Sequence, residues 1–221
     1  MGESAIVCDG RMGMSLATAY LQAFEQQPMP SGHATARAGI AIVNTHYPFA
    51  RAYKLAEDLA RNAKSYRAEL KGADVATLDW HFGVNGQVET LGNTRKRDYT
   101  VAAGNLQMRP LRLKGQANDW RSWDTFEKLV TDLQDDRDLN ERRNVLKALR
   151  GILRQGEEAT RAFCRVRQIR LPSLSGHSNA HESGWLERRC VYYDAIEAMD
   201  LFQRLPVSLA DLAQPDSEVT A

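Results

Sequence analysis

The chain has few cysteines and no long apolar run. Its three cysteines, Cys8, Cys164 and Cys190, are too few and too far apart for the disulfide framework of a small secreted domain. No apolar stretch approaches the ~20 residues that a membrane-spanning helix needs. No basic segment followed by an apolar one marks a secretory signal at the N-terminus. We therefore expect a cytoplasmic protein.

Net charge is also small. The formal charge is +1 over 221 residues, so the overall charge gives no indication of binding to nucleic acid or to an anionic membrane. The hydrophobic content of 43% and the charged content of 26% are typical of a soluble globular protein. This length is sufficient for one large or two small domains with a substantial core. Composition alone leaves the function open.

The most informative segment runs from His33 to Lys64. Apolar residues recur at every second position over residues 34–43, which predicts a strand. Gly39 interrupts this strand, where a missing side chain lets another backbone or a ligand approach closely. Pro48 stands where a helix would begin, and apolar residues follow at helical spacing as far as Lys64.

The same periodicities predict the other elements. In the first half we expect a short buried strand over residues 4–8, a helix over 12–26 and a further strand over 75–82. A hairpin turn at 85–86 and an extended ribbon over 94–101 and 106–113 should follow. The character changes near Lys114. After it we expect only helices, over residues 123–133, 139–153 and 185–205, with a shorter helix that follows residue 153 and ends near residue 168.

Two short stretches resemble one known family. They are the HYPF turn with the helix that closes on Ala63-Lys64, and the strand segment Leu78-Asp79-Trp80-His81. They resemble the second palm domain of the large polymerase-like subunit of type III CRISPR effector complexes and its stand-alone relatives in prokaryotic defence. These palms are in turn similar to the catalytic domains of diguanylate cyclases. The closing CVYYDAIEAMDLF is similar to the helical tail that follows the palm in the stand-alone relatives.

The resemblance implies an α+β fold. Residues 1–114 would form the later half of a ferredoxin-like palm, with an antiparallel sheet and its helices on one face. Residues 115–221 would form an all-helical domain with a disordered C-terminal tail. From the residues themselves, alternating burial in the strands and one apolar stripe on each helix favour the same two-layer arrangement.

Family palms carry a β-hairpin with a Gly-Gly-Asp-Asp tip, whose carboxylates bind two divalent ions such as Mg²⁺. Laid on this pattern, the chain begins almost at the tip, and Glu3 is the residue placed to ligate a metal. One carboxylate cannot hold two Mg²⁺ ions, because each needs several oxygen ligands. We therefore assign no catalytic residue. The chain is either a truncated product, which we favour, or a degenerate palm with a binding role.

The resemblance also implies nucleotide-binding residues. In the cyclase relatives, a lysine that closes this helix contacts the nucleotide phosphates, which assigns this role to Lys64. Arg67 and Lys71 would add to the same patch, and Gly39 would leave room for the nucleotide. The alternative for Lys64 is a cation that stabilises the C-terminal end of a helix.

Two classes of function remain open. The first is a nucleotide-binding palm-like protein of a prokaryotic antiviral, CRISPR-like defence system, with a nucleoside triphosphate and other defence-system subunits as partners. The second is a non-catalytic interaction module that docks a partner through its helical half. Two further pairs of polar residues are not assigned to a functional site. Asp79 and His81 share one strand face, where a structural hydrogen bond is favoured over acid–base chemistry. Asp194 and Glu197 are one helical turn apart, a spacing that is common on exposed helix faces and indicates no particular function.

Overall fold

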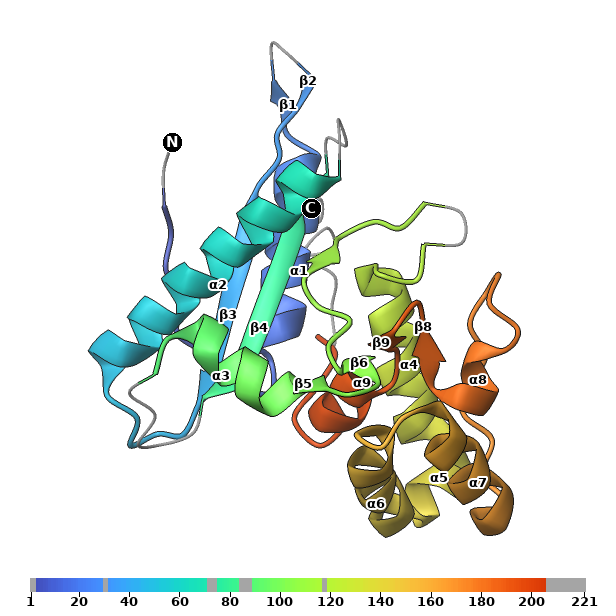
Figure 1. The fold of residues 1–221 in the computed structure, drawn as a ribbon. Helices are drawn as coiled ribbons and strands as arrows, with labels where there is room; N and C mark the ends of the chain where they lie inside the picture. The colour runs from blue at the N-terminus through green and yellow to red at the C-terminus, as the bar shows by residue number, and fades with distance from the viewer. Residues whose placement is uncertain (1–2, 30–31, 71–74, 84–88, 117–118, 206–221) are drawn as a thin grey trace, which may run out of the picture. The chain divides into compact units, whose positions relative to one another are not determined.

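A computed structural model describes residues 3–29, 32–70, 75–83, 89–116 and 119–205 (Figure 1). The chain divides into two compact units. Unit 1 comprises Met1–Gly83 together with Leu201–Ala221, and unit 2 comprises Val84–Asp200. The division therefore falls after Gly83 and again before Leu201. The boundary near residue 114, which the sequence suggests from a change in the type of fold, stays a prediction. The predicted C-terminal tail and the Asn85-Gly86 turn lie outside the described residues.

Unit 1 consists of a helix, a small hairpin and a strand–helix–strand segment. Its elements are α1 (Gly13–Glu25), β1 (Pro28–Met29), β2 (Gly32–His33), β3 (Arg37–Val43), α2 (Phe49–Glu69) and β4 (Thr77–Gly83). The predicted strand over 34–43, the helix that follows Pro48 and the strand over 75–82 are confirmed as β3, α2 and β4. Pro48 is the N-cap of α2, with an extended backbone that turns the chain into the helix.

The antiparallel pairing predicted for this sheet is wrong for β3 and β4, which run parallel in a register that places Gly39 opposite Asp79. The 21 residues of α2 bring the chain back to the starting edge, so the second strand repeats the direction of the first. Figure 1 shows α2 in front of these two strands and α1 behind them. The predicted placement of both helices on one face is therefore wrong as well.

Side-chain alternation along β3 explains the two covered faces. A Cβ added at Gly39 would meet the α2 backbone, so this face of the strand lies against α2. Ile40, on the opposite face, lies within 3.5 Å of the position that a Cβ would take at Gly13, at the start of α1. Successive strand residues point to opposite faces, so each helix buries its own side of the strand.

The buried strand predicted at residues 4–8 is not present. The segment is extended, every residue from Glu3 to Asp9 is exposed, and Ile6 and Val7 have relative exposures of 58% and 78%. Among the described residues no strand pairs with it, and a strand is stable only when its backbone groups have partners. Its apolar composition alone therefore gave a wrong prediction.

Unit 2 is mostly helical and carries a small sheet. Its elements are α3 (Leu91–Tyr99), β5 (Thr100–Val101), β6 (Gly104–Asn105), β7 (Leu111–Arg112), α4 (Trp123–Asp135), α5 (Arg137–Glu141), α6 (Arg143–Leu153), α7 (Glu157–Arg167), α8 (Ala180–Ser183), β8 (Trp185–Leu186), β9 (Arg189–Cys190) and α9 (Tyr193–Ala198). Strands β5, β6, β9 and β8 form one sheet in that order. The α+β fold class is confirmed.

The helices predicted in unit 2 are confirmed as α4, α5–α6 and α7. Helices α4 and α6 each present an apolar stripe to the core, whereas α7 buries Thr160 and Cys164. Two predictions are wrong. The ribbon over 94–101 is mainly helix α3, whose N-cap Thr90 accepts a hydrogen bond from the backbone N–H of Asn93. The last predicted helix begins instead with the β8–β9 hairpin, so the region after residue 114 is not all-helical.

The reason lies in the turn between β8 and β9. Glu187 and Arg188 both have positive φ, at 48° and 60°. Two consecutive residues of this kind make the tight turn whose twist suits a hairpin, and they cannot continue a helix.

Within the described part of the chain, every helix is too short or too polar to span a bilayer.

Candidate functional site

Lys64 lies on the exposed surface of α2. The helix continues beyond it to Glu69, so Lys64 does not close the helix as the sequence predicted. It therefore stands more than a turn before the helix end. A cation stabilises the helix dipole only within the last turn, so the alternative role of Lys64 as a helix-end cation has little support.

The ion pairs on α2 distinguish Lys64 from its neighbours. Lys54 lies 3.4 Å from a carboxylate oxygen of Asp58, and Arg61 lies 2.9 Å from the same oxygen. Glu57 forms longer ion pairs with the same two residues, at 3.6 Å from Lys54 and 3.9 Å from Arg61. Lys64 follows Arg61 by three residues, on the same side of the helix. Within the ranges that the structure describes, it has no carboxylate partner.

Arg67 continues this line of basic residues. It lies three residues beyond Lys64, in the last turn of α2, and is half-buried. The spacing Arg61–Lys64–Arg67 therefore gives the helix a short basic stripe. Lys71, which the sequence placed in the same patch, lies outside the described residues.

Gly39 faces α2, and the helix backbone fills the space beside it. A Cβ at this position would lie 2.1 Å from the carbonyl oxygen of Ala56 and 2.3 Å from the backbone nitrogen of Ala60. The glycine therefore permits the close approach of another backbone, one of the two possibilities that the sequence raised. It holds α2 against β3, and this contact is sufficient to explain the residue without a ligand.

Glu3 is exposed in the extended segment that precedes α1. Asp9, six residues further along the chain, has its carboxylate held by Arg11, which donates hydrogen bonds of 3.1 and 2.8 Å from its side chain. These bonds lower the pKa of Asp9 from 3.8 to about 2. In the described ranges, no group of three or more His, Cys, Asp or Glu side chains comes together. Among the described residues, Glu3 therefore belongs to no group of side chains that could hold a metal ion.

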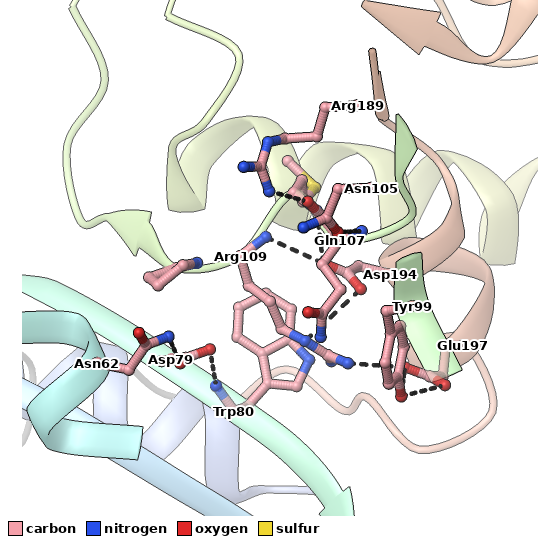
Figure 2. A network of polar contacts seen from close by, with 12 residues as sticks. Asn62, Asp79, Trp80, Tyr99, Asn105, Gln107, Arg109, Arg189, Asp194 and Glu197 are labelled. Atoms are coloured by element: carbon pink, nitrogen blue, oxygen red, sulfur yellow. Dashed lines mark hydrogen bonds and ion pairs between the residues drawn. The ribbon is translucent and has the colours of Figure 1, made fainter. Parts of the chain in front are cut away.

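Asp79 is fully buried in β4, on the face that α2 covers (Figure 2). One of its carboxylate oxygens accepts a hydrogen bond of 2.7 Å from the side-chain amide of Asn62, and the other accepts one of 2.9 Å from the backbone N–H of Trp80. The partner across the helix–strand contact is therefore Asn62. This agrees with the structural role predicted for Asp79.

Unit 2 contains a second polar cluster that the sequence did not predict. It joins the segment that contains β6 and Arg109 to α9, and its members are Tyr99, Gln107, Arg109, Asp194 and Glu197 (Figure 2). The side chains of Arg109 and Asp194 are both 0% exposed, and Glu197 is 14% exposed. The one-turn spacing of Asp194 and Glu197 is common on exposed helix faces, but in this structure both side chains lie in the interior or close to it.

Asp194 binds the backbone of the chain at Met108 and Arg109. One oxygen of its carboxylate accepts hydrogen bonds from the backbone N–H groups of Met108, at 2.9 Å, and Arg109, at 3.1 Å. The guanidinium of Arg109 donates to Glu197 at 3.2 Å and lies 5.0 Å from the centre of the Tyr99 ring. The Tyr99 hydroxyl donates to both oxygens of Glu197, at 2.9 and 3.1 Å.

Burial dominates the electrostatics of this cluster. It raises the pKa of Asp194, although Arg109 and the backbone N–H groups oppose the rise. Burial also raises the pKa of Tyr99. One oxygen of Asp194 accepts the two backbone hydrogen bonds, whereas the other lies 3.7 Å from Arg109 and accepts none from the described residues. Desolvation therefore offsets much of the attraction within this buried ion pair. The spacing of Asp194 and Glu197, one helical turn apart and among apolar residues, was the available sequence signal.

The residues predicted for the site lie on different elements of unit 1. Lys64 and Arg67 lie on one helix, Gly39 lies beneath that helix, and Glu3 lies in a separate extended segment. Comparisons with protein-family models and with curated proteins find no match to this chain. The assignment of function therefore depends on the residues themselves.

Proposed function

We propose that this chain is a nucleotide-binding, palm-like protein of a prokaryotic antiviral, CRISPR-like defence system, which acts in the cytoplasm beside other defence-system subunits. The palm resemblance of the HYPF turn, the Ala63-Lys64 helix and the LDWH strand motivates the class of protein. As given, the chain lacks a Gly-Gly-Asp-Asp tip. We propose nucleotide binding for this chain and assign no catalytic residue.

The observation that carries the proposal is the availability of Lys64. Its ammonium group is exposed on α2, while Lys54 and Arg61 on the same helix are engaged by Glu57 and Asp58. An ammonium without a carboxylate partner can donate hydrogen bonds to a triphosphate as a point charge. Arg67, one turn further along, supplements the positive potential.

The remaining predicted residue acts through the helix. Gly39 lets α2 lie directly on β3, which sets the height of Lys64 above the sheet. Gly39 therefore positions the phosphate-binding helix in this proposal and does not touch the nucleotide. Glu3 has no part in it.

Calorimetric titration with ATP and GTP tests the proposal. Replacing Lys64→Ala removes one charge-assisted contact, so the affinity of the variant should fall about ten- to a hundredfold. Arg51→Ala is the matched control, since Arg51 is also an exposed cation of α2 and lies near its other end. Parent and control should bind alike. Equal affinities for all three proteins, or no binding by the parent, would reject the proposal.

The alternative, a scaffold that docks through the helical half, finds no specific support. Among the described residues, the large exposed apolar side chains of unit 1 are Ile6, Val7, Tyr20, Phe49, Tyr53 and Leu201. In the described part of unit 2, the corresponding residue is Val166. Of these residues, Val166 and Leu201 lie after residue 114, in the helical half, and the other five lie before it. The exposed apolar side chains are therefore mainly outside the helical half, and we do not adopt that alternative.

A further inference from the structure

Charge is strongly segregated along unit 2. Residues 142–170 contain nine Lys and Arg but only two acidic residues, Glu157 and Glu158. The preceding residues 119–141 contain eight Asp and Glu but only three basic residues. The whole-chain charge of +1 therefore conceals a basic segment that forms α6 and α7. Such an asymmetry is a recognised indication of a polyanionic partner.

On α6 the basic residues form one line. Arg143, Lys147, Arg150 and Arg154 follow each other at spacings of four, three and four, which places them on one side of the helix. All four are exposed, whereas Leu146, Leu149 and Leu153 are buried on another side. At a rise of ~1.5 Å per residue, the line extends for about 16 Å. We call these four residues the α6 basic stripe.

The groups that face the stripe leave it with excess positive charge. Asp200 lies 3.0 Å from both Arg143 and Lys147, so one carboxylate serves two cations. Arg154 donates to the backbone carbonyl of Asp98 at 2.6 Å, which neutralises no charge. In the described part of unit 2, Arg150 and Arg154 form no ion pair with a carboxylate. Both lie beside Tyr193, whose pKa burial raises, so that tyrosine is neutral near pH 7.

The exposed residues next to the stripe on α6 include no large apolar side chain. They are Asn144, Ala148 and Gly151, and a Cβ at Gly151 would meet nothing within 4 Å. Protein interfaces are centred on large apolar or aromatic side chains, which these residues do not provide. A linear array of guanidinium and ammonium groups instead matches regularly spaced phosphates.

We propose that the α6 basic stripe binds the sugar–phosphate backbone of a nucleic acid. The contacts are charge-assisted hydrogen bonds to phosphate oxygens, which carry no sequence information. Because the exposed residues of α6 include no aromatic side chain, base stacking does not contribute on this helix. Binding should therefore be insensitive to base sequence and strongly dependent on salt.

Fluorescence anisotropy with labelled oligonucleotides of about 20 residues tests this site, at salt concentrations from about 50 to 200 mM. Single-stranded RNA, single-stranded DNA and a DNA duplex serve as separate probes of the full chain. Lys147→Gln with Arg150→Gln removes two cations from the stripe and leaves Arg143 with Asp200. The double variant Arg161→Gln with Arg165→Gln removes two exposed cations from the neighbouring helix α7, so the change in net charge is the same.

The α6 double variant should bind at least about tenfold more weakly at the lowest salt. For a single strand, its slope of log affinity against log salt should be smaller by about 1.4, since each contact accounts for ~0.7. The α7 variant should stay close to the parent. Tighter binding of the single strands or of the duplex identifies which form the stripe fits, and either form supports the proposal.

Three results would overturn it. The first is an absence of binding to all probes at the lowest salt. The second is an equal loss in the α6 and α7 variants, which would indicate a response to net charge alone. The third is a difference in affinity between single-stranded probes of different base sequence that exceeds the difference in affinity caused by salt. It would indicate that the protein recognises bases at another place. Far-UV circular dichroism of each variant confirms that the helices are retained.

Discussion

Arg109 and Asp194 form an ion pair at 3.7 Å in which both side chains are fully buried, although they are 85 residues apart in the chain. The contact joins the segment before the Arg109–Pro110 bond to the short helix α9. A buried pair of this kind has a large effect when one partner is removed, because the other charge is left without compensation.

Replacing Asp194→Ala should therefore lower the free energy of unfolding by about 3–5 kcal/mol. The change removes the acceptor of the Met108 and Arg109 backbone N–H groups as well as the charge opposite Arg109. Denaturation by urea, followed by circular dichroism, measures the effect. Asp200→Ala is the control, because its ion pairs are on the surface and should contribute less than about 1 kcal/mol. Similar losses in unfolding free energy for the two variants would show that the buried ion pair contributes no more to stability than the surface pairs of Asp200.

The stability contributed by Asp194 should also depend on pH. Burial raises its pKa above the ordinary value of 3.8, while Arg109 and Arg95 oppose the rise and Glu197 adds to it. A raised pKa means that the folded protein holds the proton more tightly than the unfolded chain does. This contribution is therefore greatest below pH 3.8 and is lost as pH rises through the folded pKa.

The measurement compares the parent with Asp194→Asn, which cannot titrate. From about pH 4 upward, the unfolding free energy of the parent should decrease relative to that of the variant. A relative increase over the same range would mean that Arg109 outweighs burial and that the folded pKa is lowered.

Gly39 gives a test of the helix–strand contact in unit 1. A Cβ at this position would lie 2.1 Å from the carbonyl oxygen of Ala56, and both groups belong to regular backbone that cannot move locally. Gly39→Ala should therefore destabilise the protein by about 1–3 kcal/mol or more. Gly151→Ala is the control, since that glycine lies in α6 with open space around it. Alanine there should stabilise the helix by up to about 1 kcal/mol. A neutral Gly39→Ala would show that α2 does not lie so close to β3.

The chain should not join or cyclise nucleotides. Two-metal catalysis needs carboxylates that hold both ions around the attacking hydroxyl and the triphosphate. Incubation of the purified chain with ATP or GTP and Mg²⁺ or Mn²⁺, followed by a pyrophosphate assay, should give no signal above that of buffer. Steady pyrophosphate release that stops on addition of a chelator would contradict this expectation. It would require carboxylates other than Glu3.

Local patterns in the sequence predict the elements whose burial follows one regular face. The helices α4 and α6 and the strands β3 and β4 could be predicted because their apolar residues recur at helical or strand spacing. The same reasoning failed at residues 4–8, where apolar side chains remain exposed. It also failed at Trp185–Cys190, where the conformations of Glu187 and Arg188 decide the structure. Neither residue type signals a positive φ.

Tertiary relationships were beyond the reach of these patterns. The parallel direction of β3 and β4 follows from the path of α2, and the burial of Asp194 follows from its partner Arg109 far along the chain. Gly39 could be recognised as a point of close approach, but whether a helix or a ligand approaches it could not. The basic segment 142–170 was visible in the sequence and was hidden only because charge was counted over the whole chain.

This segregation of charge has a consequence for how the protein behaves during purification. A chain with a formal charge of +1 would ordinarily be held weakly by a cation-exchange resin near neutral pH. Resin contacts are made by one face at a time, so retention follows the local rather than the average charge. The aligned cations of α6 should hold the protein on sulfonate beads well above the salt at which its net charge predicts release. Nucleic acid from the lysate would then compete for the same face of the protein.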